Sequence, residues 1–254
     1  SKGRAIQNLI NIEQDDKVKA FICTQDLKDE EYINSHFVIM ATKKGQVKKT
    51  SLEQYSRPRS NGINAITIKD EDELLEAKLT SGSSQIMLAV KSGKAIRFEE
   101  SKTRPMGRNA SGVRGIRLKD KSDEVIGMVS VKNMDENILV VSENGYGKRS
   151  SLEDYRLTNR GGKGVKTISI TEKTGNLVTI KSVSDNDDLM IINKSGIAIR
   201  MRVEDLRVMG RATQGVKAIS IKEGDGIAAV AKVMKDEEGI EDINDIEFEG
   251  DAVK

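Results

Sequence analysis

The stretch GYGKRSSLEDYRLTNRGGKGVKTISI, from Gly145 to Ile170, decides the fold of this chain of 254 residues. It starts with a glycine and a short polar strand, continues into a basic, glycine-rich loop, and ends in a strand in which apolar and polar residues alternate. Three other segments have the same order, and they begin at Gly45, Gly93 and Gly196. A repeat with a period of roughly 50 residues therefore runs through the chain.

An apolar run precedes each of these segments and another follows it, which gives four strands per repeat. The preceding runs are FVIMAT, QIMLAV, NILVVS and DLMIIN, and the following runs are ELLEAKLT, EVIGMVSV, NLVTIKSV and IAAVAKVM. Short strands at a fixed period predict an all-β propeller of four-stranded blades, because radial packing buries both faces of each blade. A superhelical β-solenoid is the alternative, but about 50 residues is long for one of its coils.

The predicted propeller domain covers residues 1–234 and holds four full repeats plus part of another. The full repeats cover residues 36–83, 84–135, 136–186 and 187–234, and the partial repeat covers about 1–35. In the partial repeat, Gly3–Ile12 is similar to the closing strand of a unit, and Lys17–Thr24 is predicted to be a strand before a charged insertion. The closing strand of each full repeat is expected after a second glycine, at Gly62, Gly112, Gly164 and Gly215.

The composition argues against several classes of function. Aromatic residues make up only 3% of the chain and tryptophan is absent, which disfavours base-stacking platforms and aromatic-lined ligand pockets. A single cysteine, Cys23, allows no disulfide framework and no cysteine metal site, as expected in a reducing cytoplasm. No run of 18 or more apolar residues and no signal-peptide pattern appears, so neither a membrane span nor a leader is predicted.

The formal net charge of +2 hides a segregation of charge along the chain. Residues 235–254 form an acidic tail with nine acidic and two basic residues, so the preceding 234 residues carry a net charge of +9. The tail has two interpretations: a solvating end, or a tethered competitor that screens the basic body and tunes its affinity for a polyanion.

The basic residues gather in the loop between the second and third strands of each repeat and in the strands beside it. The predicted DNA-binding residues are Lys48, Lys49, Arg57, Arg59, Lys94, Arg97, Lys102, Arg104, Arg108, Arg114, Arg117, Lys148, Arg149, Arg156, Arg160, Lys163, Lys166, Arg200, Arg202, Arg207, Arg211 and Lys217. Because equivalent loops project from the same edge of a propeller, they predict a belt of positive charge that suits the phosphates of a nucleic acid.

The predicted belt has no means of reading bases, since there is no recognition helix, zinc finger or set of stacking aromatics. We therefore expect sequence-nonspecific contact with the backbone of duplex DNA and a preference for bendable DNA. Two alternatives stay open: a propeller scaffold whose basic rim binds an acidic protein, and a propeller that binds RNA. Taken singly, each loop is also compatible with an ordinary solvated surface.

No segment predicts an active site. NRGGKGV lacks the G-x-x-x-x-G-K-[ST] pattern of a phosphate-binding loop, and the single histidine, His36, stands beside an acidic insertion without a catalytic partner pattern. Cys23 lies in an apolar run and is expected to be a buried thiol. We therefore predict no catalytic residue, no metal ligand and no cofactor in this chain.

Three segments carry a resemblance to a known family: GYGKRSSLEDY (145–155), MGRNASGVRGIRL (106–118) and MGRATQGVKAISI (209–221). They closely resemble the C-terminal domain of bacterial DNA gyrase A, and the resemblance extends from Gly3 to about Met234. It implies a six-bladed β-pinwheel, a propeller relative whose blades exchange strands and whose basic rim wraps duplex DNA. It also implies a role in giving direction to negative supercoiling, with the cleaving tyrosine, the ATPase and the use of ATP and Mg in other parts of the enzyme.

The implied partners are duplex DNA, the rest of the gyrase A protein and the gyrase B protein in an A2B2 assembly, with no membrane partner. The implied location is the bacterial cytoplasm, at the nucleoid. The sequence departs from the family pattern in having four repeats and part of another, where the family has six. The family's heptapeptide Q-[RK]-R-G-G-[RK]-G is missing, and only Arg160–Gly164 is similar to it. The related C-terminal domain of topoisomerase IV is the alternative within the family.

Overall fold

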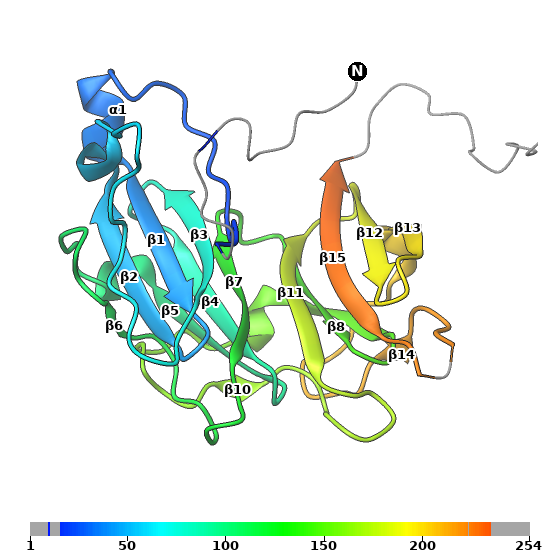
Figure 1. Ribbon diagram of the computed structural model, residues 1–254. Coiled ribbons are helices and arrows are strands. Elements are labelled where there is room, and N and C mark those ends of the chain that lie inside the picture. The colour runs from blue at the N-terminus through cyan, green and yellow to red at the C-terminus, as the bar shows by residue number, and fades with distance from the viewer. Residues whose placement is uncertain (1–9, 11–15, 223, 235–254) are drawn as a thin grey trace, which may run out of the picture.

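The computed structural model describes residues 10, 16–222 and 224–234, and these form four antiparallel β-sheets (Figure 1). In spatial order the first sheet is β3 (Leu74–Thr80), β1 (Phe37–Thr42), β2 (Gln46–Ser51) and β6 (Val113–Arg114). The second is β7 (Val125–Val131), β4 (Gln85–Val90), β5 (Lys94–Glu99) and β10 (Val165–Lys166). The predicted all-β architecture of four-stranded blades is confirmed.

The third sheet is β11 (Leu177–Val183), β8 (Asn137–Ser142), β9 (Tyr146–Ser151) and β14 (Val216–Lys217). The fourth has three strands: β15 (Ile227–Met234), β12 (Asp187–Asn193) and β13 (Ala198–Arg202). Each four-stranded blade takes three strands from its own repeat and the fourth from the repeat that follows it in the chain. Strand exchange therefore links each blade to the next.

The blades are arranged so that β3, β7, β11 and β15 contact one another in succession. These strands lie at one edge of each sheet, and the exchanged strands β6, β10 and β14 lie at the opposite edge. Figure 1 shows β7 and β11 side by side in the middle of the molecule, where the second and third blades meet.

The core consists of layers between neighbouring blades. Along β8, Ile138 and Val140 pack into the cluster shared with the second blade, whereas Leu139 and Val141 pack into the cluster shared with the fourth. Successive residues of a strand point to opposite faces, so a strand buried on both faces needs a continuous apolar run. That is why NILVVS and its equivalents lack polar alternation.

A short 3₁₀ helix ends the second strand of every repeat. These helices are η2 (Leu52–Tyr55), η3 (Glu100–Lys102), η4 (Leu152–Asp154) and η5 (Val203–Asp205). Each contains a buried residue just before the chain enters the basic loop: Leu152 packs between the second and third blades, whereas Leu52 packs against α1 and the first blade. The loops thus start from equivalent points in all four repeats.

Three local predictions are wrong. Lys17–Thr24 and Gly62–Lys69 do not form strands, although both have strand-like patterns, because no neighbouring strand in the described chain pairs with them. Cys23 is exposed, not buried. The charged insertion contains a helix, α1 (Glu30–Ser35), which the side chain of Asp29 caps by accepting a hydrogen bond from Tyr32 N. Apart from Ile10, the predicted strand Gly3–Ile12 lies outside the described residues, as does the acidic tail, 235–254.

Candidate nucleic-acid interface

The basic loops, here called the rim loops, are residues 56–61, 103–112, 156–164 and 207–215. The last three begin with a parallel β-bridge to the second strand of the preceding blade, and the bridged pairs are Lys49–Pro105, Arg97–Leu157 and Arg149–Val208. Each loop then leads into the strand that it gives to that blade. A rim loop therefore spans the seam between two blades.

The segment that follows each of the first three rim loops is joined to the next rim loop by a backbone hydrogen bond. Arg117 N donates to Gly162 O (2.8 Å), and Ser169 N donates to Thr213 O (3.2 Å). In the first repeat Thr67 N donates to Ala110 O (3.3 Å). The loops thus form a continuous band along one side of the molecule, which is the geometry that the predicted belt requires.

Twelve of the 22 predicted residues lie in the rim loops or in the segments beside them and have side chains without a described partner. Within the described part of the chain, no hydrogen bond or ion pair engages the side chains of the following exposed or half-buried residues: Arg57, Arg59, Lys94, Lys102, Arg104, Arg114, Arg117, Arg156, Lys163, Lys166, Arg207 and Lys217. Free guanidinium and ammonium groups at equivalent places in successive repeats can bind phosphates without rearrangement of the loop. That they bind DNA stays a prediction.

A second group of arginines is half-buried and fastens the rim loops. Arg160 Nε donates to Lys102 O (2.9 Å) and its Nη1 to Arg114 O (3.0 Å). Arg211 makes the same pair of bonds one repeat later, to Asp154 O and Lys166 O (both 2.8 Å). In the repeat before, Arg108 Nη1 donates to Asn64 O (3.3 Å). These guanidinium groups hold one loop against the loop or strand before it.

Two predicted residues, Lys48 and Lys148, are wholly buried beneath the rim loops and cannot contact DNA in this structure. Lys148 Nζ donates to Gly210 O (2.7 Å), Arg211 O (2.5 Å) and Thr213 Oγ1 (3.1 Å). Lys48 Nζ donates to Arg108 O (2.7 Å) and to Ala65 O. A buried ammonium group needs such acceptors to offset the loss of its hydration. These lysines therefore clamp the backbone of the loops.

Burial also changes the acidity of the two clamps. It lowers the pKa of Lys48 to about 8, and the nearby positive charge of Arg108 acts in the same direction. Burial likewise lowers the pKa of Lys148 to about 8, with Asp154 opposing the shift and Arg211 adding to it. Both ammonium groups remain largely charged at neutral pH and lose their protons in mildly alkaline solution.

Three further predicted residues, Lys49, Arg97 and Arg149, are buried at the seams, so their assignment to the exposed rim is corrected too. Arg97 Nη1 donates to Leu152 O and Tyr155 O of the next repeat (both 2.9 Å). Arg149 Nε donates to Leu206 O (2.7 Å), while Lys49 pairs with the buried carboxylate of Glu100 (2.9 Å). The sequence held a signal for this role, since a base recurs at the same strand position in every repeat.

Arg200 occupies that position in the fourth repeat, yet it is exposed and bonds within its own blade, to Asp188 (2.7 Å). The exposed Arg202 pairs with Glu204 (3.0 Å) and Asp205 (3.2 Å). Both arginines are therefore occupied by carboxylates and are weaker candidates for phosphate contact.

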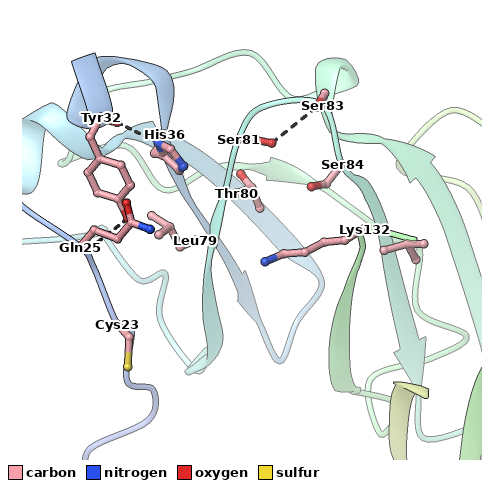
Figure 2. Close-up of a pocket in the computed structure, with 11 residues that line it drawn as sticks. Cys23, Gln25, Tyr32, His36, Leu79, Thr80, Ser81, Ser83, Ser84 and Lys132 are labelled. Atoms are coloured by element: carbon pink, nitrogen blue, oxygen red, sulfur yellow. Dashed lines mark hydrogen bonds between the residues drawn. The ribbon is translucent and has the colours of Figure 1, made fainter. Parts of the chain in front are cut away.

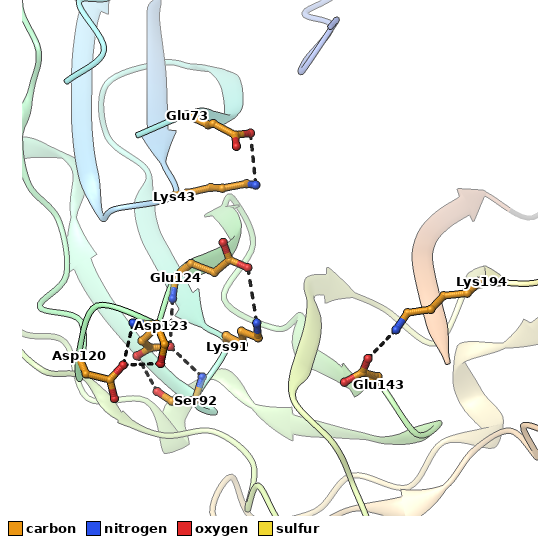
Figure 3. Close-up of polar contacts among 10 residues, drawn as sticks. Lys43, Glu73, Lys91, Ser92, Asp120, Asp123, Glu124, Glu143 and Lys194 are labelled. Atoms are coloured by element: carbon orange, nitrogen blue, oxygen red, sulfur yellow. Dashed lines mark hydrogen bonds and ion pairs between the residues drawn. The ribbon is translucent and has the colours of Figure 1, made fainter. Parts of the chain in front are cut away.

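The hairpin-turn ends of the blades have compensated charge, in contrast to the rim loops. Figure 3 shows Lys43 paired with Glu73, Lys91 facing Glu124, and Lys194 paired with Glu143 across the seam between two blades. Asp123 accepts hydrogen bonds from Ser92 N (3.0 Å) and Ser92 Oγ (2.8 Å) and so fixes one of these turns. Ion pairs thus occur at the hairpin-turn ends, whereas the arginines of the rim loops make none among the described residues.

A cavity of about 620 Å³ near the strand joint of the second blade is lined by four lysines. Two of them, Lys94 and Lys166, were predicted and face each other across the β5–β10 pair. The other two, Lys91 and Lys119, escaped the prediction because they lie outside the loop-and-strand pattern on which it was based. Alignment of the repeats could have found Lys119, since Lys69 and Lys222 occupy equivalent positions.

A second cavity lies beside α1, at the single histidine and the single cysteine of the chain. Figure 2 shows a cavity of about 670 Å³ beside α1, lined by Cys23, Tyr32, His36 and a serine-rich turn among other residues. The Nδ1 atom of His36 lies 2.8 Å from Tyr32 O, and none of the described hydrogen bonds joins Cys23 to His36. Among the same residues, no cluster of His, Cys, Asp or Glu could hold a metal ion, and no helix is long and apolar enough to cross a membrane.

Comparison with known proteins agrees with this architecture. A family model described as "DNA gyrase C-terminal domain, beta-propeller" matches residues 36–81, 85–132, 136–184 and 187–234. The DNA gyrase A protein of Staphylococcus aureus (strain NCTC 8325 / PS 47) is 44% identical over 239 residues, which are 94% of this chain and 26% of that protein. The protein from strain MRSA252 is 44% identical over 237 residues. The chain thus spans about a quarter of the length of these relatives.

Two solved structures have the same fold. The C-terminal domain of DNA topoisomerase IV superposes with a TM-score of 0.83 at 24% identity, covering 91% of this chain and 71% of that one. The C-terminal domain of DNA gyrase A superposes with a TM-score of 0.80 at 23% identity, covering 92% of this chain and 76% of that one. At 23–24% sequence identity, these two similarities establish the fold alone.

Proposed function

Because the chain belongs to the family of DNA gyrase C-terminal domains, we propose that it is a non-catalytic module that binds the backbone of duplex DNA along its rim loops. The observation that carries the proposal is the repetition, on successive rim loops, of exposed basic residues that have no partner among the described residues, such as Arg104, Arg156 and Arg207. A regular series of cations along a curved edge fits the regular series of phosphates on a duplex.

Contacts on successive blades make bending a natural consequence of binding. Smooth bending of 20–30 base pairs by 40–90° costs on the order of 1–6 kcal/mol. A single loop with two or three cations could not offset that cost, whereas several loops acting together can. We infer that the duplex follows the rim and is wrapped, and that this wrap gives direction to supercoiling when the domain is part of a complete topoisomerase.

In the longer protein, strand cleavage and nucleotide hydrolysis belong to other domains, and the partners are the remainder of a gyrase A protein and a gyrase B protein. The fold leaves a domain of the topoisomerase IV type as the second candidate, since that structure superposes equally well. The 44% identity to DNA gyrase A proteins favours gyrase.

Charge reversal on the rim tests the proposal. The variant carrying Arg104→Glu and Arg156→Glu should bind a duplex of about 40 base pairs at least tenfold more weakly than the unmodified chain. The slope of log K against log salt should become shallower by roughly 1.8, because each lost phosphate contact removes about 0.9. Neither residue has a described side-chain partner, so the fold should not change.

The matched control reverses two exposed lysines away from the rim loops, Lys44→Glu and Lys132→Glu, which gives the same change in net charge. Equal losses of affinity in the two double variants would show that only the net charge matters, and would refute the proposal that DNA binds along the rim loops. The scaffold function would instead be favoured by an acidic protein that competes with DNA for the unmodified chain but does not compete for the rim variant.

A further inference from the structure

An exposed apolar residue lies at the same position in each of the last three rim loops, directly after an exposed arginine. These residues, here called the rim apolar residues, are Pro105, Leu157 and Val208. Leu157 is 46% exposed and Val208 is 54% exposed. We propose that the rim apolar residues pack against the sugars of the minor groove of duplex DNA. The contact rests on the proposed function, since it requires DNA along the rim loops.

The backbone holds each rim apolar residue in a fixed place. Each one is the loop member of the parallel β-bridge to the second strand of the preceding blade. The next residue in the chain donates a backbone hydrogen bond to that strand, and these bonds are Met106 N to Lys49 O (2.8 Å), Thr158 N to Arg97 O (2.9 Å) and Met209 N to Arg149 O (2.7 Å). Because at most side-chain rotation remains to be restricted on binding, the entropic cost of the contact is low.

Leu157 stays exposed although rim loops are present on both sides of its own loop. The segments that follow the second and third rim loops connect all three of these loops by backbone hydrogen bonds. Two positions before Leu157, the side chain of Tyr155 is only 1% exposed. The fold therefore buries one apolar residue at this point of the chain and directs the other into solvent. One exposed apolar residue is ordinary on a protein surface, but three at one position in successive repeats indicate a common partner.

The arginine beside each rim apolar residue indicates the minor groove. Guanidinium groups enter a narrow minor groove, where the negative potential of DNA is enhanced, and wrapping narrows this groove wherever it faces the protein. The sugars that line the groove offer apolar contact whatever the base sequence. The major groove, about 12 Å wide, takes a helix or a β-ribbon, and its apolar contacts are with thymine methyl groups. Single residues on a loop therefore fit the minor groove better.

An apolar contact with DNA has a different salt dependence from a contact between a cation and a phosphate. A lysine or arginine that binds a phosphate releases counterions and steepens the dependence of log K on log salt by about 0.9. Burial of Leu157 or Val208 against a sugar removes apolar surface from water and releases no counterion. Loss of this contact should therefore weaken binding by the same factor at every salt concentration.

A double variant, Leu157→Asn with Val208→Thr, makes two rim apolar residues polar while it keeps their size and the net charge. Fluorescence anisotropy with a duplex of about 40 base pairs should show binding about fivefold weaker than that of the unmodified chain. The slope of log K against log salt should not change. Both side chains are exposed in the free chain, so the midpoint of urea unfolding should also stay the same.

The matched control, Phe21→Gln, replaces an apolar side chain that is 75% exposed but shares a cavity with β3, at the edge of the first sheet away from the exchanged strand. It should bind DNA like the unmodified chain. Unchanged affinity in the double variant, as expected if the rim apolar residues dock a protein instead of DNA, overturns the proposal. A shallower salt slope in the double variant also overturns it, because the substitutions would then have displaced the cations.

The same titrations separate this proposal from the proposed function. If the rim loops bind no DNA, the charge-reversal variant Arg104→Glu with Arg156→Glu is no weaker than the unmodified chain, and both the function and the minor-groove contact are refuted. If the rim loops bind DNA through their cations alone, the charge-reversal variant loses affinity and salt dependence while the apolar double variant loses neither. In that case only the minor-groove contact is refuted.

Base analogues test which groove faces the rim. Diaminopurine in place of adenine adds an amino group to the minor groove, whereas methylation of cytosine at C5 adds a methyl group to the major groove. The unmodified chain should bind the diaminopurine duplex several-fold more weakly than ordinary DNA, and the variant Leu157→Asn with Val208→Thr should lose less. Cytosine methylation should change neither affinity. Equal losses in the two proteins would assign the diaminopurine effect to a stiffer duplex, and a loss on methylation would place the contact in the major groove; either result overturns the proposal.

Discussion

At the scale of single residues, basic side chains with similar sequence contexts have three different roles. Arg104 and Arg156 are exposed and unpaired among the described residues, Arg160 fastens a loop through two backbone carbonyls, and Lys148 is buried under a loop as its clamp. Which of these three roles a basic residue has depends on whether its side chain extends into solvent or packs against another repeat. Only the first role is suited to direct contact with a phosphate.

The clamp Lys148 predicts a pH dependence of stability. Its pKa in the folded chain is about 8, below the usual lysine value of 10.5, because burial disfavours the charged form. Between these values the unfolded chain binds more protons at this site than the folded chain, so this residue's contribution to the free energy of unfolding rises as pH rises from 8 to 10.5. Below pH 8 both forms are protonated and the contribution is constant.

Urea unfolding at neutral pH and at a pH between the two pKa values measures this effect against Lys148→Met, which has a side chain of similar length. The stability of the unmodified chain relative to the variant should increase between the two pH values. The exposed Lys44→Met serves as the control and should show no such change. A difference that is the same at both pH values for Lys148→Met would contradict the lowered pKa.

The fastening arginines predict an effect on loop order. In Arg160→Lys the charge is kept, but an ammonium group cannot reach Lys102 O and Arg114 O with the planar geometry of a guanidinium. We expect amide hydrogen exchange in residues 156–164 to become several-fold faster, with a loss of stability of about 1 kcal/mol. The matched variant Arg156→Lys, whose side chain has no described partner, should leave exchange in the same loop unchanged.

At the scale of elements, the exchanged strands are short but closely packed. Gly112 precedes β6 with φ of +88°, and an added Cβ would lie 2.5 Å from Val47 O in β2, the strand that pairs with β6. Gly112→Ala should therefore lose roughly 1–2 kcal/mol of stability to left-handed strain and a further 1–3 kcal/mol, on the order found for overpacked sites, to the close contact. Gly224→Ala, with φ of +81° and open space, should show only the first loss. Denaturant unfolding of the two variants compares them, and equal losses would show that β6 does not pack as described.

The sequence predicted most of these elements from the repeat itself. The apolar runs predicted β1, β4, β8 and β12. The two sets of glycines predicted the hairpin turns and the starts of the segments that contain the exchanged strands. The strand predicted at 62–69 is wrong for a physical reason: a strand exists only with a partner, and no described strand pairs with this segment. The buried bases failed similarly, because burial in a seam depends on the neighbouring repeat and not on the local sequence.

At the scale of the whole molecule, the seams make the blades dependent on one another. Each of the last three rim loops is bridged to the second strand of the preceding blade and hydrogen-bonded to the segment that follows the preceding rim loop, so the position of its exposed arginines depends on at least two repeats. This coupling explains how a chain with few aromatic residues holds a regular array of cations. It also explains why the array, more than any single loop, is the functional unit.

The salt dependence of binding is a property of the whole array. If the duplex contacts loops of several blades at once, the slope of log K against log salt should be steeper for a duplex of about 40 base pairs than for one of about 10, since a short duplex reaches fewer phosphate-binding residues. Fluorescence anisotropy at several salt concentrations measures both slopes. Identical slopes for the two lengths would confine binding to one loop.

The central claim, that DNA is wrapped along the rim, is tested most directly by the topology of closed circles. Nicked plasmid is sealed by ligase in the presence of increasing amounts of the chain, and its linking number is measured after the protein is removed. The account predicts a shift in linking number that grows with the ratio of protein to DNA and is largely lost when Arg104, Arg156 and Arg207 are changed to Glu. An unchanged distribution of topoisomers at a ratio where the chain is bound would contradict it.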